Sequence, residues 1–484
     1  MNPTLLCRLI GLLLLLAGAL QLLPALVAWL YGDSSFATFI ATGSGLFLLG
    51  AAVWWPVRRI RIDLRLRDGF LVVALSWIVI GLAGALPMVL LQVPRIGVVD
   101  AIFESISGLT TTGATVLTGL DTMPHGLLFH RALLQWLGGM GIVVLAVAVL
   151  PMLRIGGLQL YRAETPGPVK DSKLTPRIAE TAKALWLIYF GLTVLCILAY
   201  HVAGMNWFDA ITHSFTTLST GGYSNYDASI AHFQSFLIEL VAIVFMTLGG
   251  INFAIHFLAW RRASLAPYQL DPEVRTYATL LLVFTAIATT AIVFYGVEPN
   301  WPSALRLGMF QTISTMTSTG YTTAGFYLWP GFLPIFFIFI VFIGGCAGST
   351  GGGMKVIRIM LLYKQAVREI QRVIHPASAG IIRIGHRAVE SRVITAVWGY
   401  FFIYVASFAI LSVLLNATGL DLETSFSAVA ACLTNLGPGL GAAGPHFADL
   451  NAVAKSVLVF AMLLGRLEIF TLLVLLTPAY WKDA

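Results

Sequence analysis

Long apolar stretches alternate with short polar connections along almost the whole chain. We expect ten membrane spans, each long enough for about 20 residues of helix, at roughly 5–30, 36–56, 70–93, 127–152, 184–204, 235–260, 276–297, 332–364, 393–416 and 452–478. Only helices and closed barrels satisfy their backbone hydrogen bonds in lipid, so this pattern predicts an all-α polytopic membrane protein. A hydrophobic content of 58%, a charged content of 11% and a mean hydropathy of +0.87 lie outside the range of soluble domains.

Four polar segments between these spans share a hydroxyl-rich sequence that ends in glycine. These segments, glycine loops 1 to 4, are Thr110-Thr111-Thr112-Gly113, Ser219-Thr220-Gly221-Gly222, Thr317-Ser318-Thr319-Gly320 and Thr434-Asn435-Leu436-Gly437. Glycine adopts backbone angles that other residues avoid, so it lets a loop turn its carbonyl oxygens toward one ion. Rings of such carbonyls replace the hydration shell of a cation in potassium filters. The repetition predicts four loops that meet around one axis.

The sequence around each glycine loop also repeats. A semi-polar stretch of about 10 residues precedes each loop; it is too short to span a bilayer and fits a half-helix that enters the membrane and returns as a loop. An apolar span with a glycine mark follows each loop, at Gly138-Gly139, Gly249-Gly250, Gly344-Gly345 and Gly465-Arg466. We therefore expect two leading transmembrane helices in residues 1–68 and four pseudo-symmetric helix–pore loop–helix repeats in 69–153, 154–260, 261–364 and 365–484. Simple helix packing is the alternative and would explain a single glycine pair, but the shared register of the glycine mark in four copies argues against it.

Basic residues gather in every second connection, after the second, fourth, sixth and eighth spans. Connections rich in lysine and arginine stay in the cytoplasm, so both termini of a ten-span chain are expected there. The net charge of +7 therefore does not indicate a nucleic-acid partner. The opposite connections hold the four glycine loops and carry eleven acidic against four basic residues. Negative charge at an outer mouth concentrates cations; the alternative is that each carboxylate is an ordinary solvated side chain.

Residues 344–353, the glycine-rich segment, interrupt the eighth span near its middle. The segment contains six glycines: Gly344, Gly345, Gly348, Gly351, Gly352 and Gly353. Each glycine in a helix interior costs about 1 kcal/mol, so we expect the helix to break here into a flexible loop below the glycine loops. A phosphate-binding loop is the alternative. Its pattern requires a lysine directly after glycine and then a hydroxyl residue, whereas Met354 precedes Lys355 and Val356 follows it.

Two ionisable residues, Arg466 and Glu468, lie inside the last apolar span. Charges at membrane depth are costly and face a cavity or a partner, and residues two apart on a helix do not face each other. Arg466 occupies the fourth glycine mark, so we expect it in the pore just inside the glycine loops, where its charge would limit cation flux. A buried ion pair with no role in permeation is the alternative. We expect Glu468 to pair with a neighbouring helix.

Together, these motifs resemble the Trk/Ktr/HKT superfamily of potassium transporters. The four glycine loops, the segment from Gly344 to Lys355 and Gly465-Arg466-Leu467-Glu468 carry the resemblance, and the two leading spans make the chain similar to the bacterial Trk-type membrane subunit. The resemblance implies a K+ selectivity filter of backbone carbonyls from all four glycine loops, a gating loop at the glycine-rich segment and a pore constriction at Arg466. It also implies potassium rather than sodium, because sodium-conducting members often have serine where this chain has Gly113.

The same resemblance implies a homodimer in the bacterial inner membrane, with K+ as the transported ion and no covalently bound cofactor. A cytosolic nucleotide-binding regulatory subunit, a TrkA-like ring, would bind the cytoplasmic face. Glycine loop 4 departs from the hydroxyl-rich pattern at Asn435 and Leu436 but keeps Gly437. Its symmetry with the other loops is therefore approximate, and selectivity is expected to be weaker than in a strictly fourfold pore.

The expected function is potassium uptake through a gated, channel-like pore that selects K+ over Na+. An ion-coupled secondary symporter, which moves K+ with H+ or Na+, is the alternative, because broken helices and intramembrane charges also suit such transporters. Their repeats are commonly inverted pairs, whereas these four copies run in the same orientation. An enzyme is not expected, since the sequence has no nucleophile–base pair or metal-ligand cluster.

Overall fold

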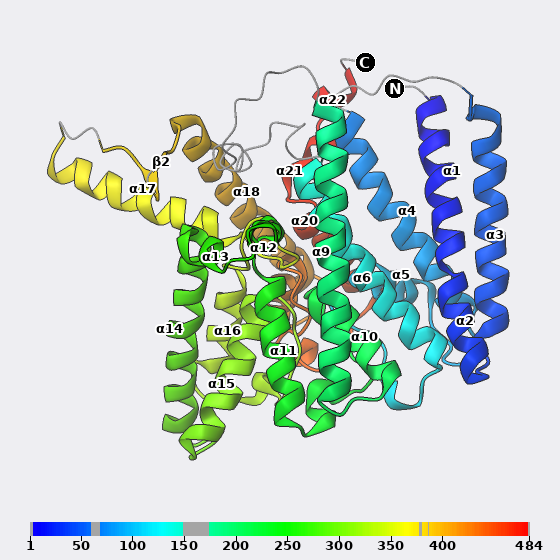
Figure 1. Ribbon diagram of the computed structural model, residues 1–484, viewed down its shortest axis with the longest axis horizontal. Helices are drawn as coiled ribbons and strands as arrows, with labels where there is room; N and C mark the ends of the chain where they lie inside the picture. Colours follow the sequence, from blue (N-terminus) through cyan, green and yellow to red (C-terminus); the bar gives the residue numbers. More distant parts are fainter. Residues whose placement is uncertain (1–2, 60–67, 149–173, 377–379, 386, 483–484) are drawn as a thin grey trace.

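The computed structural model describes residues 3–59, 68–148, 174–376, 380–385 and 387–482. These residues are mostly helical, and the two strands among them, β1 (Arg383–Ile384) and β2 (Arg387–Ala388), form one short antiparallel hairpin. The first helix begins and the last helix ends at the same side of the molecule (Figure 1), which agrees with an even number of membrane crossings. Much of the basic sequence that supports the predicted orientation, at 60–67 and 149–173, lies outside the described residues.

The two leading spans form a hairpin at one edge of the molecule (Figure 1). They consist of α1 (Pro3–Leu20) with α2 (Leu22–Tyr31), and of α3 (Phe36–Trp54) with the 3-10 turn η1 (Trp55–Val57). Small residues let the backbones of membrane helices approach closely, and a Cβ atom at Gly18 would lie closer than 3.0 Å to the carbonyl oxygen of Gly43. The Gln21 side chain donates to the Ala83 carbonyl (3.2 Å) and joins the hairpin to the first repeat.

Four repeats follow, each with a first span, a pore helix, a glycine loop and a second span. Repeat 1 contains α4 (Asp68–Leu90), α5 (Val98–Leu109), η2 (Leu120–Thr122) and α6 (His125–Ala148). Repeat 2 contains α9 (Leu174–Val202), α10 (Trp207–Leu218), η3 (Ser229–Phe233), α11 (Phe236–Gly249) and α12 (Phe253–Arg262). Repeat 3 follows α13 (Ala266–Leu270) and contains α14 (Pro272–Phe294), α15 (Trp301–Met316), η4 (Phe326–Leu328), α16 (Leu333–Val341) and α17 (Val356–Ile374). Repeat 4 contains α18 (Ser391–Asn416), α19 (Leu422–Leu433), η5 (Gly441–Ala443), α20 (Ala452–Arg466), α21 (Phe470–Leu476) and α22 (Pro478–Lys482).

The four pore helices, α5, α10, α15 and α19, are enclosed by the spans. Most of their residues are buried, including many serines and threonines, whereas the spans expose large apolar side chains such as Leu282 (73% exposed). Irregular backbone at membrane depth is tolerated only where protein surrounds it or where it lines a cavity. A polar centre inside an apolar exterior meets this condition.

Two of the expected spans, 235–260 and 452–478, are each formed by two helices with a sharp bend between them. Six helices of the described part are long and apolar enough to cross a membrane, and two further helix pairs qualify only as bent spans. These pairs are α11 with α12, bent by 97°, and α20 with α21, bent by 117°. Asn252 is the N-cap of α12, because its side chain accepts a hydrogen bond from the Ala254 N–H (2.9 Å). Glu468 and Ile469 interrupt the last span with φ angles of 54° and 46°.

The eighth expected span, 332–364, is also broken, where the glycine-rich segment predicts a break. α16 ends at Val341 and α17 begins at Val356. α17 is amphipathic and projects sideways from the body of the molecule (Figure 1), so it does not continue the span. The expected span 127–152 corresponds to α6 and extends into residues outside the described ranges.

Gly138→Ala is expected to destabilise the fold, because the added Cβ would lie closer than 3.0 Å to the Leu109 carbonyl at the end of a pore helix. Overpacking of this kind costs about 1–3 kcal/mol. The matched control is Gly191→Ala, in a helix where the added Cβ meets no atom within 4 Å; it should be neutral or stabilising by up to about 1 kcal/mol. Thermal unfolding in detergent measures both variants, and equal melting temperatures would contradict the close packing at Gly138.

Candidate functional site

The four glycine loops share one backbone conformation. Each loop begins where its pore helix ends and has positive φ angles at its second and fourth positions. The second-position angles are 52° at Thr111, 52° at Thr220, 58° at Ser318 and 57° at Asn435. The fourth-position angles are 80° at Gly113, 74° at Gly222, 81° at Gly320 and 105° at Gly437. Residues other than glycine rarely adopt such angles, so their recurrence in all four loops marks one shared geometry.

The N–H groups of each loop bond back to its own pore helix. In loop 1 the Thr111 N–H donates to the Gly108 carbonyl (3.0 Å) and the Thr112 N–H to the Ser107 carbonyl (2.9 Å). The equivalent bonds measure 3.1 and 2.9 Å in loop 2, 2.9 and 2.8 Å in loop 3, and 3.3 and 2.8 Å in loop 4. First-position hydroxyl groups donate to the pore helices as well. Because the pore helix accepts the hydrogen bonds of these N–H groups, the carbonyl oxygens of the loop are the groups that could coordinate a cation.

The fourth-position glycines join the loops into a closed ring. A Cβ atom added at any of them would lie closer than 3.0 Å to a third-position carbonyl oxygen of the next loop. For Gly113, Gly222, Gly320 and Gly437 these carbonyls belong, in the same order, to Gly221, Thr319, Leu436 and Thr112. Loop 1 thus contacts loop 2, loop 2 contacts loop 3, loop 3 contacts loop 4, and loop 4 contacts loop 1. This closed order of contacts matches four loops arranged around one axis.

A cavity of about 520 Å³ borders the ring. Its lining includes Gly113, Gly222 and Gly320, together with Pro438 directly after loop 4. Loops 1, 2 and 3 therefore line the cavity with their last glycines, and repeat 4 lines it with the residue that follows loop 4. The fourth positions of loops 1, 2 and 3 border this space, whereas the first or second positions of loops 2, 3 and 4 contact the glycine-rich segment.

Most of the acidic residues predicted at the outer mouth make internal contacts. Three of the four basic residues on that side pair with them: Arg131 with Glu104 (2.8 Å), Arg306 with Glu239 (2.5 Å) and Lys455 with Asp100 (2.6 Å). Asp209 accepts hydrogen bonds from Asn225 and Tyr226, and Asp227 accepts two backbone N–H groups of the first repeat. A carboxylate beside an opposite charge contributes little field at a distance, so much of the predicted negative charge supports the structure instead.

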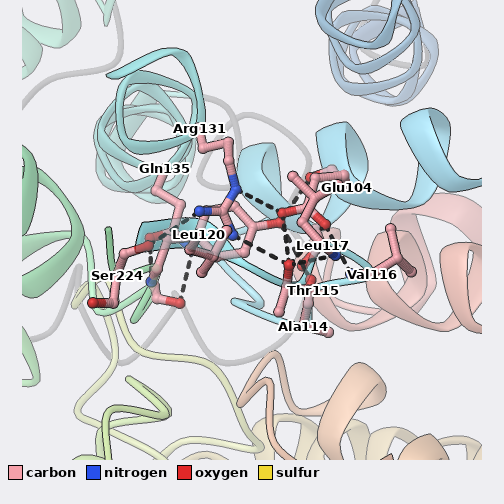
Figure 2. A network of polar contacts seen from close by, with 12 residues as sticks. Glu104, Ala114, Thr115, Val116, Leu117, Leu120, Arg131, Gln135 and Ser224 are labelled. Atoms are coloured by element: carbon pink, nitrogen blue, oxygen red, sulfur yellow. Dashed lines mark hydrogen bonds and ion pairs between the residues drawn. The ribbon is translucent and has the colours of Figure 1, made fainter. Parts of the chain in front are cut away.

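A buried ion pair stands behind loops 1 and 2 (Figure 2). Glu104 on α5 and Arg131 on α6 are both fully buried, and they face each other at 2.8 Å. The same carboxylate accepts bonds from the Thr115 hydroxyl and the Val116 N–H, while Arg131 donates to the Ser224 carbonyl (3.1 Å). The pair therefore ties the chain that leaves loop 1 to the chain that leaves loop 2.

The glycine-rich segment contacts the loops at their first and second positions. Thr350, in the segment, donates its hydroxyl to the carbonyls of Leu218 and Gly249 (3.0 Å each). The same hydroxyl accepts a bond from Thr220, the second residue of loop 2 (3.2 Å). The segment is thus joined to repeat 2 by hydrogen bonds.

Two further bonds connect this segment to loops 3 and 4. The Gly352 N–H donates to the Ser318 hydroxyl (2.6 Å), and the Gly353 N–H donates to the Thr434 carbonyl (3.1 Å). A Cβ atom at Gly352 would lie closer than 3.0 Å to that carbonyl, so only glycine permits the approach. The segment therefore contacts three of the four glycine loops.

Arg466 lies beside the same segment, at the end of α20. Its side chain is buried, and its guanidinium donates to the Thr350 carbonyl (2.9 Å) and to the Gly138 carbonyl (3.2 Å). It therefore reaches from repeat 4 to repeats 3 and 1. Its Nε has no hydrogen-bond partner among the described residues. Its described partners are carbonyl oxygens rather than the carboxylate that a buried ion pair would require.

Glu468 pairs with Arg358 at the start of α17 (2.5 Å), which confirms the prediction of a neighbouring helix as its partner. The sequence reasoning missed two other buried polar side chains. Lys355 donates to the Gly351 carbonyl at the end of the glycine-rich segment, and Gln135 contacts loop 2. A polar residue inside a predicted apolar span was the available signal for both.

Comparison with known proteins agrees with this geometry. Residues 35–482 match the family model TrkH, described as a cation transport protein. The chain belongs to the TrkH family of cation transport proteins. The Trk system potassium uptake protein TrkH of Vibrio parahaemolyticus is 51% identical over 478 residues, which cover 98% of this chain and 99% of that relative. The TrkH of Escherichia coli strain K12 is 48% identical over 476 residues, which cover 98% of this chain and 99% of that relative.

A more distant relative and a solved structure extend the match. The Trk system potassium uptake protein TrkG of Escherichia coli is 38% identical over 473 residues, covering 98% of this chain and 97% of that protein. The crystal structure of the potassium transporter TrkH from Vibrio parahaemolyticus superposes with a TM-score of 0.93 at 48% identity, covering 99% of this chain and 100% of that one. The predicted membrane fold and the predicted family are confirmed. Relatives in the TrkH family are named as transport proteins, as predicted, and not as enzymes.

Glu104→Gln is expected to lower the free energy of unfolding by about 3–5 kcal/mol, because it leaves the buried Arg131 charge without its partner. Glu390→Gln is the matched control, since the Glu390–Arg392 ion pair is exposed to solvent and such pairs contribute no more than about 1 kcal/mol. Thermal and denaturant unfolding of the purified proteins in detergent compares the two variants. Similar losses of stability would argue against a structural role for the buried pair.

Proposed function

We propose that this chain takes up potassium ions through the ring of four glycine loops. The closed order of contacts between glycines and carbonyls supports this most directly, because it gathers four equivalent loops around one path. A dehydrated cation needs several oxygen ligands at once, and rings of backbone carbonyls supply them. The TrkH-family relatives described above are named potassium uptake proteins.

In this proposal residues 110–113, 219–222, 317–320 and 434–437 form the selectivity filter, and their carbonyls coordinate K+. Selectivity over Na+ depends on the number and field strength of these carbonyl dipoles. The unusual fourth loop is tied to the first, since the Asn435 amide donates to the Thr112 hydroxyl (2.9 Å) and to the Met462 carbonyl (3.1 Å). Asn435 thus supports loop 4 without the hydroxyl pairs of its neighbours.

The glycine-rich segment and Arg466 form the gate of the proposed pore. The bonds of the segment to the first and second positions of the loops, and the bond of Arg466 to Thr350 of the segment, correspond to a closed conformation. Opening requires the bonds of Thr350, Gly352 and Gly353 to break. The ion pair between Arg358 and Glu468 joins the start of α17 to the break after α20. A movement of α17 would therefore reach both parts of the gate.

We also propose a homodimer in the bacterial inner membrane, with cytoplasmic termini and a cytosolic nucleotide-binding regulatory subunit. α17 supports a regulatory contact because it projects from the body of the molecule (Figure 1) and directly follows the glycine-rich segment. It exposes several large apolar side chains, namely Tyr363, Ile370, Val373 and Ile374. Exposed apolar groups on an amphipathic helix favour contact with another protein.

Gly113→Ser is expected to lower the K+ over Na+ permeability ratio about tenfold, a change of about 1.4 kcal/mol. The added side chain would displace the Gly221 carbonyl from its place in the ring. The matched control is Gly119→Ser, which has a similar φ angle of 75° but no atom within 4 Å of the added Cβ. Reversal potentials under opposed K+ and Na+ gradients give the ratio. An unchanged ratio in Gly113→Ser would refute the filter assignment.

Arg466→Ala is expected to raise the K+ current about tenfold, since removing a positive charge beside the path lowers the barrier and each 1.4 kcal/mol corresponds to a factor of about ten. Arg466→Lys keeps the charge and should remain closer to the wild type. Unitary currents of purified protein in planar bilayers measure the effect. Obligatory coupling of K+ to H+ or Na+, in place of unitary currents, would favour a symporter and contradict the channel mechanism.

A further inference from the structure

Glycine loop 2 differs from the other loops at its third position. Thr112, Thr319 and Leu436 carry side chains there, whereas loop 2 has Gly221. The backbone does not require glycine at this position, because Gly221 is not among the residues with positive φ, although the following Gly222 is. Another contact must explain why a side chain is missing.

The side chain of Gln135, on α6 of repeat 1, fills the space that a third-position side chain would take in loop 2. A Cβ atom at Gly221 would lie closer than 3.0 Å to the carbon, oxygen and nitrogen of the Gln135 amide. Gln135 is fully buried. Its Nε2 donates to the Gly221 carbonyl (2.8 Å), and its Oε1 accepts the Tyr223 N–H (3.1 Å). Both ends of the amide therefore bond to backbone groups, one in loop 2 and one in the residue directly after it.

Loops 1 and 3 are held in a different way at the same position. The third-position hydroxyl lies 2.7 Å from the first-position hydroxyl in both loops, between Thr112 and Thr110 and between Thr319 and Thr317. Loop 2 cannot form this bond because Gly221 has no hydroxyl. Its first-position residue, Ser219, donates to its own pore helix at 3.4 Å. An amide from the neighbouring repeat thus replaces a hydroxyl pair within the loop.

α6 holds the chain of loop 2 with a second side chain on the same face. Arg131 is four residues before Gln135, and residues at this spacing are neighbours on a helix. Figure 2 shows Arg131 and Gln135 side by side, with Ser224 nearby. Arg131 donates to the Ser224 carbonyl (3.1 Å), so the backbone from Gly221 to Ser224 is fixed at both ends by buried side chains of repeat 1.

We propose that Gln135 is a positioning residue that sets the ion selectivity of the pore through the Gly221 carbonyl. This inference rests on the proposed function, because it takes Gly221 as part of the K+ filter. A carbonyl oxygen has two lone pairs, and the Gln135 N–H occupies one of them and thereby fixes the direction of the other. Discrimination depends on the number and field strength of the carbonyl ligands, so a carbonyl released from this bond would turn toward the smaller Na+ ion.

The test compares K+ over Na+ permeability ratios in planar bilayers for the wild type, Gln135→Ala, Gly221→Thr and the double variant. Gln135→Ala is expected to lower the ratio roughly fivefold, the factor for one lost hydrogen bond. Gly221→Thr alone should lose most of its current, because the new side chain collides with Gln135. The double variant should regain current relative to Gly221→Thr and selectivity relative to Gln135→Ala, since its threonine fills the vacated space as in loops 1 and 3.

Two controls separate this role from a purely structural one. Gln135→Met keeps the volume without the donor; it should lower the ratio as Gln135→Ala does, and it decides the question if the alanine variant does not fold. Gln21→Ala removes another buried glutamine, in the leading hairpin, whose amide donates to the Ala83 carbonyl (3.2 Å), and should leave the ratio unchanged. A wild-type ratio in Gln135→Met, or a double variant no better than Gly221→Thr, overturns the inference.

Gly113→Ser in the same assay separates this inference from the proposed function. If Gly113→Ser lowers the ratio and the Gln135 variants do not, the filter assignment stands and the role of Gln135 is refuted. If the wild type itself does not distinguish K+ from Na+, both proposals fail.

Discussion

The architecture depends on four irregular backbone segments that are packed together inside a membrane protein. Such segments must be enclosed by protein, and their polar groups must be satisfied. The N–H groups of the glycine loops bond to their own pore helices, and the fourth-position glycines bring each loop against the carbonyl of the next. A side chain at any of these glycines would separate two loops. The centre of the molecule is therefore set by contacts that leave no room for a methyl group.

The backbone of the ring repeats in all four loops, but the side chains that hold the loops in place differ from one loop to the next. The ion pair of Glu104 and Arg131 holds the chain after loops 1 and 2, and the amide of Asn435 joins loop 4 to loop 1. An unpaired buried charge is costly, so the ion pair has to form whenever the repeats pack as they do. Loops with the same backbone conformation can thus be held by different side chains, so a substitution can alter the support of one loop without altering that of the others.

Hydrogen bonds from the glycine-rich segment and the residue after it satisfy carbonyl groups at the C-terminal ends of two helices near the ring. The last carbonyl groups of a helix have no partner within the helix. The Thr350 N–H donates to the Gly249 carbonyl at the end of α11 (3.2 Å), and the N–H of Met354, directly after the segment, donates to the Phe342 carbonyl just after α16 (3.0 Å). A segment that opens the proposed gate would have to leave these carbonyls to water or to another donor. Opening is therefore coupled to the stability of the two helix ends.

Local composition was enough to predict where most of the spans, the four glycine loops and the break at 344–353 lie, because apolar length and left-handed backbone angles depend on residues that are close in sequence. The bends of 97° and 117° and the contact of Gln135 with Gly221 could not be predicted in this way. They depend on what each residue packs against: Gly191 lies within an unbroken helix with no atom near its missing side chain, whereas Gly249 ends a helix against Leu218 and Thr350. The partners are distant in sequence, so only the packing of the four repeats selects them.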